Sequence, residues 1–141
     1  MKSIALFQSD AFDHSWPSEN TDPNAVPLGR DAAEYLKTKL AEQNIAVQNP
    51  IQGEGGWVVD GDFQKILFSL FVHWAPIGTP PTDHWVIQSR LRRGLMKSIF
   101  SSSKFPEQLQ PLITILNNAL VRDSRINSLT WIDEAEFAAI Y

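Results

Sequence analysis

The fold is decided by residues 57–74, which read WVVDGDFQKILFSLFVHW. Within this stretch Asp60-Gly61 lies between two apolar runs. This dipeptide favours a type I′ turn, because both central residues of that turn need positive φ. The segment therefore predicts a β-hairpin whose second strand covers Phe63–Trp74.

The second strand of this hairpin has two different faces. Alternate residues of a strand point to opposite sides of the sheet. One side is uninterrupted in its apolar character and must be core: Ile66, Phe68, Leu70, Val72 and Trp74. The other side is mixed: Lys65, Leu67, Ser69, Phe71 and His73. The pattern predicts a sheet with one dry face and one partly exposed face.

Helices and strands are predicted on both sides of the hairpin. Upstream, we expect a strand at residues 3–8, a helix at 29–43 and an extended piece from residue 45. Downstream, we expect a strand at 84–92, a helix from about residue 108, a strand at 128–132 and a helical turn in 133–141. This order predicts one α+β domain spanning residues 1–141. We expect a two-layer sandwich, with two helices packed on one face of a mainly antiparallel sheet of four to five strands.

The composition excludes several classes of chemistry. The chain has 141 residues, 43% of them hydrophobic, and it contains no cysteine. It therefore has no disulfide framework, thiolate zinc site, iron–sulfur cluster or cysteine nucleophile. It also lacks a glycine-rich phosphate loop that opens a helix, and a Gly-x-Ser-x-Gly nucleophile motif. We expect no cofactor, and the sequence favours a protein without enzymatic activity.

The net charge of −4 is unevenly distributed along the chain. Residues 1–70 carry five basic and ten acidic side chains, whereas residues 71–141 carry seven basic and six acidic ones. Several of these acidic side chains lie in a proline-rich segment, residues 9–28, which we expect to be a long surface loop. The basic cluster begins at Arg90 and Arg92. An acidic protein is a poor candidate for general binding to nucleic acid or to anionic membranes.

No targeting or membrane-spanning segment is expected. The apolar run at residues 4–7 is too short for the hydrophobic region of a signal peptide. No stretch approaches the roughly 18 uncharged apolar residues of a transmembrane helix. We therefore expect a cytoplasmic protein with no membrane partner.

The mixed face of the sheet is the leading candidate for a binding site. Aromatic and arginine side chains supply most of the affinity in protein–protein interfaces. Such residues occur on two neighbouring predicted strands, and two tryptophans extend the set. The candidate binding residues are Leu67, Phe71, Val86, Gln88, Arg90, Arg92, Trp16 and Trp57. The pattern predicts binding of a protein partner or of a second copy of the chain.

A small metal-binding protein or a hydrolase-like enzyme is the main alternative. His73 and His84 would be neighbours if their strands pair, and Asp83 precedes His84. Imidazole and carboxylate groups are ligands of zinc and iron, and Glu54 would supply a further carboxylate. A third hypothesis is a small-molecule pocket lined by tryptophans, namely Trp57, Trp74 and Trp85.

Three short motifs are spread along the chain. They are GRDAA at residues 29–33, where a helix opens, EGGW at 54–57 and HW at 84–85. In this combination the chain resembles small bacterial α+β proteins of uncharacterised function, some of which are similar to the immunity proteins of toxin systems. The resemblance implies an acidic single-domain protein, and it assigns no role to individual residues.

Overall fold

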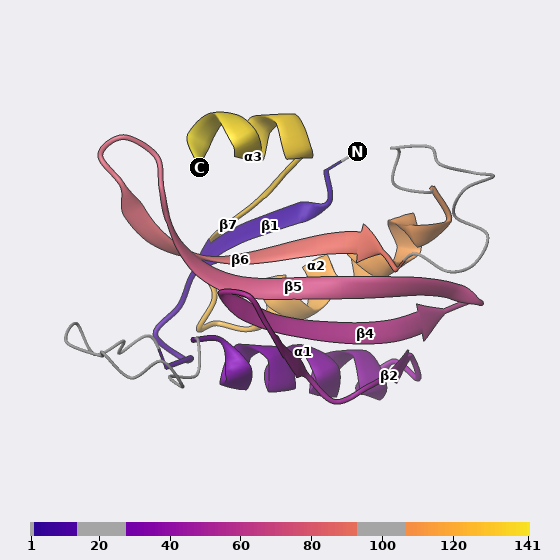
Figure 1. Cartoon of the computed structure of the whole chain (residues 1–141). Coiled ribbons are helices and arrows are strands. Elements are labelled where there is room, and N and C mark those ends of the chain that lie inside the picture. Colours follow the sequence, from indigo (N-terminus) through magenta and orange to yellow (C-terminus); the bar gives the residue numbers. More distant parts are fainter. Residues whose placement is uncertain (1, 14–27, 93–106) are drawn as a thin grey trace.

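One antiparallel sheet organises the molecule (Figure 1). The computed structural model describes residues 2–13, 28–92 and 107–141. Within these ranges seven strands form one sheet in the order β2-β4-β5-β6-β1-β7, and β3 also pairs with β4. The strands are β1 (Ile4–Gln8), β2 (Ala46–Val47), β3 (Ile51–Gly53), β4 (Gly56–Phe63), β5 (Ile66–Ile77), β6 (Thr82–Leu91) and β7 (Asn127–Ile132). The predicted α+β class and antiparallel sheet are confirmed, with more strands than the four to five expected.

The described helices pack on both faces of this sheet. They are α1 (Arg30–Glu42), α2 (Gln110–Arg122), which follows a 3₁₀ turn at Glu107–Leu109, and α3 (Glu134–Ile140). In Figure 1, α1 runs along the lower side of the sheet, α2 lies behind it and α3 lies at the top. The predicted two-layer arrangement is not confirmed, because α3 covers part of the face opposite to α1 and α2. None of the described helices is long and apolar enough to cross a bilayer.

The two faces of the sheet bury separate groups of side chains. We call the face covered by α1 and α2 the core face, and the opposite one the front face. On the core face, leucines of α1 and α2 such as Leu36 and Leu116 join one large cluster with Phe68, Leu70 and Val72 of β5. The second cluster lies on the front face beneath α3 and contains Ile4, Leu6, Ala75, Ile77, Val86, Ile132 and Phe137. The predicted dry face of β5 is therefore confirmed as core.

The predicted hairpin forms, but the predicted position of its turn is wrong. Asp60 and Gly61 lie inside β4, and the turn is Gln64-Lys65, whose φ angles are 52° and 68°. The register pairs Phe63 with Ile66 at the turn. Two consecutive positive φ angles are typical of a type I′ turn, here without the usual glycine.

The longer pairing of β4 with β5 explains this position. It extends to the pair Trp57 and Val72, and it places Trp57 and Val59 on the core face. A turn at Asp60-Gly61 would pair Val59 with Asp62 and remove every observed pair between β4 and β5. A non-glycine residue in the left-handed region costs about 1–2 kcal/mol, whereas burying one large apolar side chain contributes about 1.5–3 kcal/mol. Burial along the longer ladder therefore outweighs the cost of the turn.

Gly61 has a packing role within β4. A Cβ atom at this position would overlap the Phe68 ring and lie 2.8 Å from the carbonyl oxygen of Ala46 in β2. The missing side chain lets β2 and the Phe68 ring approach β4 closely.

Replacing Gly61 with alanine is expected to lower the free energy of unfolding by about 1–3 kcal/mol, the usual cost of forcing extra volume into a packed site. Urea denaturation measures the change. The matched control is Asp62→Ala, because Asp62 is the next residue of β4 and is exposed; its effect should stay within about 0.5 kcal/mol. Equal effects of the two substitutions would contradict the close approach at Gly61.

Candidate interaction surface

Cross-strand rows of side chains build the front face of β4, β5 and β6. Towards the hairpin turn these rows are Val58–Phe71–Gln88, Asp60–Ser69–Arg90 and Asp62–Leu67–Arg92. We define the open sheet face as Val58, Asp60, Asp62, Leu67, Ser69, Phe71, Arg90 and Arg92. Each of these side chains is half-buried or exposed. The open sheet face is therefore the part of the front face that α3 leaves uncovered.

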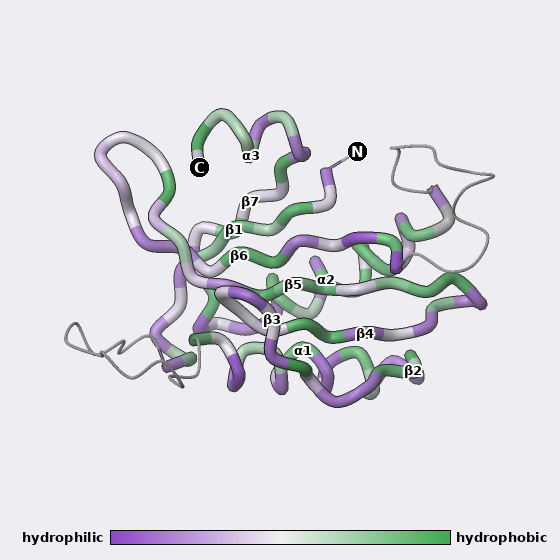
Figure 2. Tube along the Cα trace, viewed as in Figure 1, coloured by the Kyte–Doolittle hydropathy of each residue, from purple (hydrophilic) through white to green (hydrophobic). Residues whose placement is uncertain are grey.

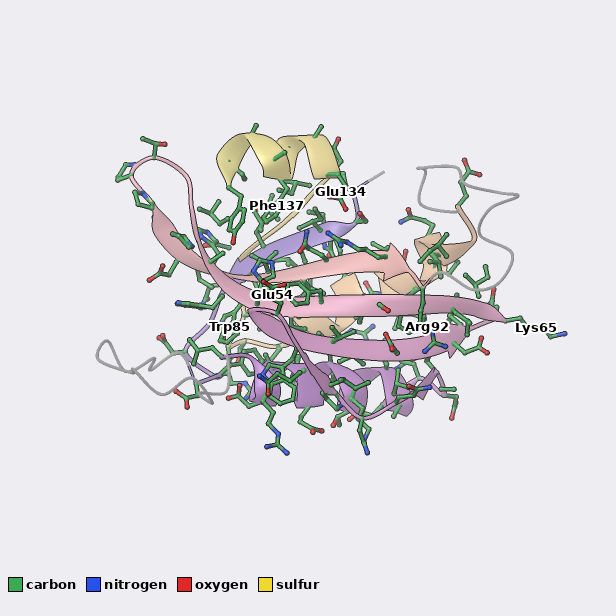
Figure 3. The ribbon with its side chains drawn as sticks, in the orientation of Figure 1. Glu54, Lys65, Trp85, Arg92, Glu134 and Phe137 are labelled. Atoms are coloured by element: carbon green, nitrogen blue, oxygen red, sulfur yellow. The ribbon has the colours of Figure 1, made fainter. Side chains whose placement is uncertain are left out.

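The charges on the open sheet face are only partly neutralised. Asp60 accepts a hydrogen bond from the Ser69 hydroxyl, and its Oδ2 lies 3.4 Å from Nη1 of Arg92. In Figure 3, Arg92 lies at the end of β6, alongside β5 and β4. Arg90 is exposed and forms no ion pair with any residue in the described ranges. The surface thus presents one arginine held by a carboxylate and one available to a partner.

Apolar side chains lie between these charged groups. Leu67 and Phe71 of β5 are half-buried on the same face as Arg90. In Figure 2, β5 is mostly apolar between more hydrophilic stretches of β4 and β6. Exposed apolar area bordered by arginines is typical of a protein–protein interface.

The structure brings together half of the predicted binding residues. Leu67, Phe71, Arg90 and Arg92 all belong to the open sheet face. Val86 is fully buried beneath α3, and Gln88 is only 7% exposed. Trp57 is buried on the core face, where the Arg30 guanidinium lies 5.6 Å from its ring, and Trp16 lies outside the described residues. Val86 and Trp57 are therefore not accessible to a partner in this structure.

Sequence reasoning placed Ser69 on the mixed face but did not include it among the binding residues, and it missed the three members that β4 contributes, namely Val58, Asp60 and Asp62. The Asp60-Gly61 dipeptide predicts that Asp60 lies in the hairpin turn, which removes it from the strand pattern. With the turn at Gln64-Lys65, Asp60 lies opposite Ser69 and diagonal to Arg92. The available signal was the alternation of β4, which places Val58 and Asp60 on the face opposite to Val59.

The residues of the metal and hydrolase alternative do not form a metal site. Within the described ranges, no group of three or more His, Asp and Glu side chains could hold a metal ion. The His73 ring packs against Phe71 at 4.8 Å between ring centroids. Nδ1 of His84 lies 2.6 Å from the carbonyl oxygen of Thr82, and Glu54 is exposed in the β3–β4 turn. This geometry gives the alternative no support.

The three tryptophans of the pocket hypothesis do gather, as core residues. Trp74 and Trp85 pack edge to face, 4.9 Å apart. Gly29, with φ 114°, sits at the start of α1 against the rings of both Trp85 and Trp57. Trp57 and Trp85 are 7% and 0% exposed. Their arrangement packs the start of α1 onto the sheet.

The chain matches no protein-family model, no curated protein and no solved structure. The function is therefore argued from the chain's own residues and their geometry.

A separate polar cluster joins α1 to the turn before β7. The Tyr35 hydroxyl donates to Oδ2 of Asp123 at 3.0 Å, and Arg125 donates two side-chain hydrogen bonds to the same carboxylate. These bonds from Arg125 hold the pKa of Asp123 well below its usual range. Burial, and then the hydrogen bond to Asp123, raise the pKa of Tyr35 to about 12. The cluster satisfies its own polar groups, so we assign it a structural role.

Replacing Tyr35 with phenylalanine is expected to destabilise the protein at neutral pH by about 1.5–3 kcal/mol, the usual contribution of a hydrogen bond to a charged group. Because the pKa of Tyr35 is raised on folding, its contribution is complete below about pH 10 and is lost as the pH rises through about 12. The stability difference between the two proteins should therefore shrink over this range. Urea denaturation at several pH values measures it, with Tyr141→Phe as the exposed control. A difference that is constant with pH would contradict the assignment.

Proposed function

We propose that this protein is a cytoplasmic, non-enzymatic interaction domain that binds a protein partner through the open sheet face. The observation that supports this most directly is the position of Leu67 and Phe71 beside Arg90, an arginine without an ion pair in the described ranges. Apolar area gives an interface affinity, and unpaired charge gives it orientation and selectivity. The open sheet face supplies both on a rigid sheet.

An immunity-type role is the specific form of this proposal. An immunity protein binds a toxin and blocks it, which requires a recognition surface and no chemistry of its own. The supporting points are the sequence resemblance and the acidic segment 9–28, whose described residues include the exposed Asp10 and Asp13. A basic toxin would complement that segment, while an acidic group of the same partner would pair with Arg90. The alternative is that a second copy of this chain occupies the open sheet face.

A photo-crosslinking amino acid in place of Leu67 should identify the occupant. It is expected to form adducts in an extract of the source cells, or with a second copy of the purified protein. The matched control carries the same amino acid in place of Thr114, which is exposed on α2. Mass spectrometry of the adducts distinguishes a toxin from a homodimer. Adducts from position 114 that equal those from position 67 would count against the open sheet face.

Substitutions on the open sheet face should weaken binding to the partner so identified. Leu67→Ala and Arg90→Glu are each expected to reduce the affinity about tenfold, or about 1.4 kcal/mol, as interface anchors do. The matched controls are Val121→Ala and Arg122→Glu, because both residues are exposed on α2. Isothermal titration calorimetry measures the four dissociation constants. Unchanged affinity in both front-face variants would remove the proposal.

A further inference from the structure

The docking of α3 on the sheet depends on very few side chains. Phe137 is its one buried residue, whereas Ile140 and Tyr141 are 40% and 67% exposed. Figure 3 shows Phe137 directed from α3 towards the sheet. Beneath it lie apolar residues from four strands, including the fully buried Ile4 and Val86. A seven-residue helix that inserts one ring, with one backbone hydrogen bond from Gly78 to its Ile140 carbonyl oxygen, separates from its sheet more easily than α1 or α2 would.

His73 lies directly beside this contact. Its ring centroid is 6.3 Å from that of Phe137 and 6.0 Å from that of Tyr141, while Phe71 packs on it at 4.8 Å. The side chain is 6% exposed, and its Nε2 has no hydrogen-bond partner in the described part of the chain. A buried imidazolium would carry an unpaired charged N–H at this atom, which costs far more than the unpaired nitrogen of the neutral ring.

No carboxylate side chain of the described residues forms an ion pair with the His73 ring. β6 contributes the cation Arg90 and the amide of Gln88, and α3 contributes the phenol of Tyr141. The acidic side chains of β4, β6, α3 and the turn before β4 are exposed, with one exception: Glu54, Asp62, Asp83, Glu134 and Glu136. The exception is Asp60 of β4, which is held by Ser69 and Arg92. Burial lowers the pKa of His73, a hydrogen bond to Gln88 partly offsets this, and Arg90 lowers the pKa further.

We propose that His73 makes the docking of α3 depend on pH, so that protonation of its ring releases α3 and uncovers the apolar cluster beneath. The inference concerns the α3 contact alone and does not depend on the proposed interface. It would give the protein a second surface, exposed only at acid pH. This surface is continuous with the open sheet face, because Val86 is followed on the front face of β6 by Gln88, which lies opposite Phe71.

The pH range follows from the direction of the pKa change. His73 is neutral when α3 is docked, and it regains the ordinary histidine pKa of about 6.5 when α3 is released. Docking is therefore complete above about pH 6.5. It weakens up to tenfold per pH unit below that value, until the pKa of the docked state is passed. The N-cap of α3 does not titrate in this range, because the hydrogen bond from the Glu136 backbone holds the pKa of Asp133 below its usual range.

Hydrogen exchange of residues 133–141 in the full chain tests the proposal. After correction for intrinsic rates, protection of these amides should fall about tenfold per pH unit below about pH 6.5, while the amides of α1 keep theirs. The His73→Phe variant keeps a buried aromatic ring at this position but has no nitrogen that can be protonated. Its protection should therefore not change with pH. His84→Gln is the matched control, because His84 of β6 lies on the same face of the sheet as His73 and its loss should leave the pH response intact.

Two results would overturn the proposal. One is pH-independent protection of α3 in the unmodified protein, and the other is an equal loss of protection in His73→Phe. An NMR titration of the His73 ring in the unmodified protein adds a measurement that needs no variant. Its midpoint should lie below the ordinary histidine value, and a midpoint at or above that value would remove the mechanism.

Discussion

The pairing of β4 with β5 is the constraint on which the rest of the structure depends. The Gln64-Lys65 turn sets a register in which Val59 and Leu70 lie opposite each other on the core face. A shift by one residue would turn every side chain of one strand to the other face. The core that holds α1 and α2, and the rows that form the open sheet face, both follow from this one alignment.

The helices cover the two faces of the sheet unequally, and the reason lies in their sequences. α1 and α2 each extend over 13 residues and present leucine stripes to the core face. α3 has seven residues and inserts Phe137 alone. The front face is therefore closed at the end near β1 and open near the hairpin turn. At the open end, the ion pair of Asp60 and Arg92 keeps polar groups satisfied while leaving them within reach of solvent.

The sequence predicts much of the fold because its strongest signals are periodic. Alternation in β5 identifies the core face and places Leu67 and Phe71 on the opposite one, wherever the turn lies. The turn itself could not be located from Asp60-Gly61, because its position is decided by burial along the whole ladder. The burial of Val86 could not be predicted either, since it depends on where α3 packs against the sheet. The Asp-x-x-Glu capping box that opens α3 at Asp133 was a readable signal for the helix, although not for its partner face.

The twelve-residue β5 strand has a consequence for how this protein can change over evolutionary time. Its even-numbered residues, from Phe68 to Val72, hold the core, whereas Leu67, Ser69 and Phe71 face outward at the open end. Under the proposed function, stability and recognition are thus encoded by interleaved positions of one strand. Mutations at the outward positions would then alter what the protein recognises while the inward positions maintain the fold. A single rigid strand can therefore diversify its specificity without the insertion of new loops.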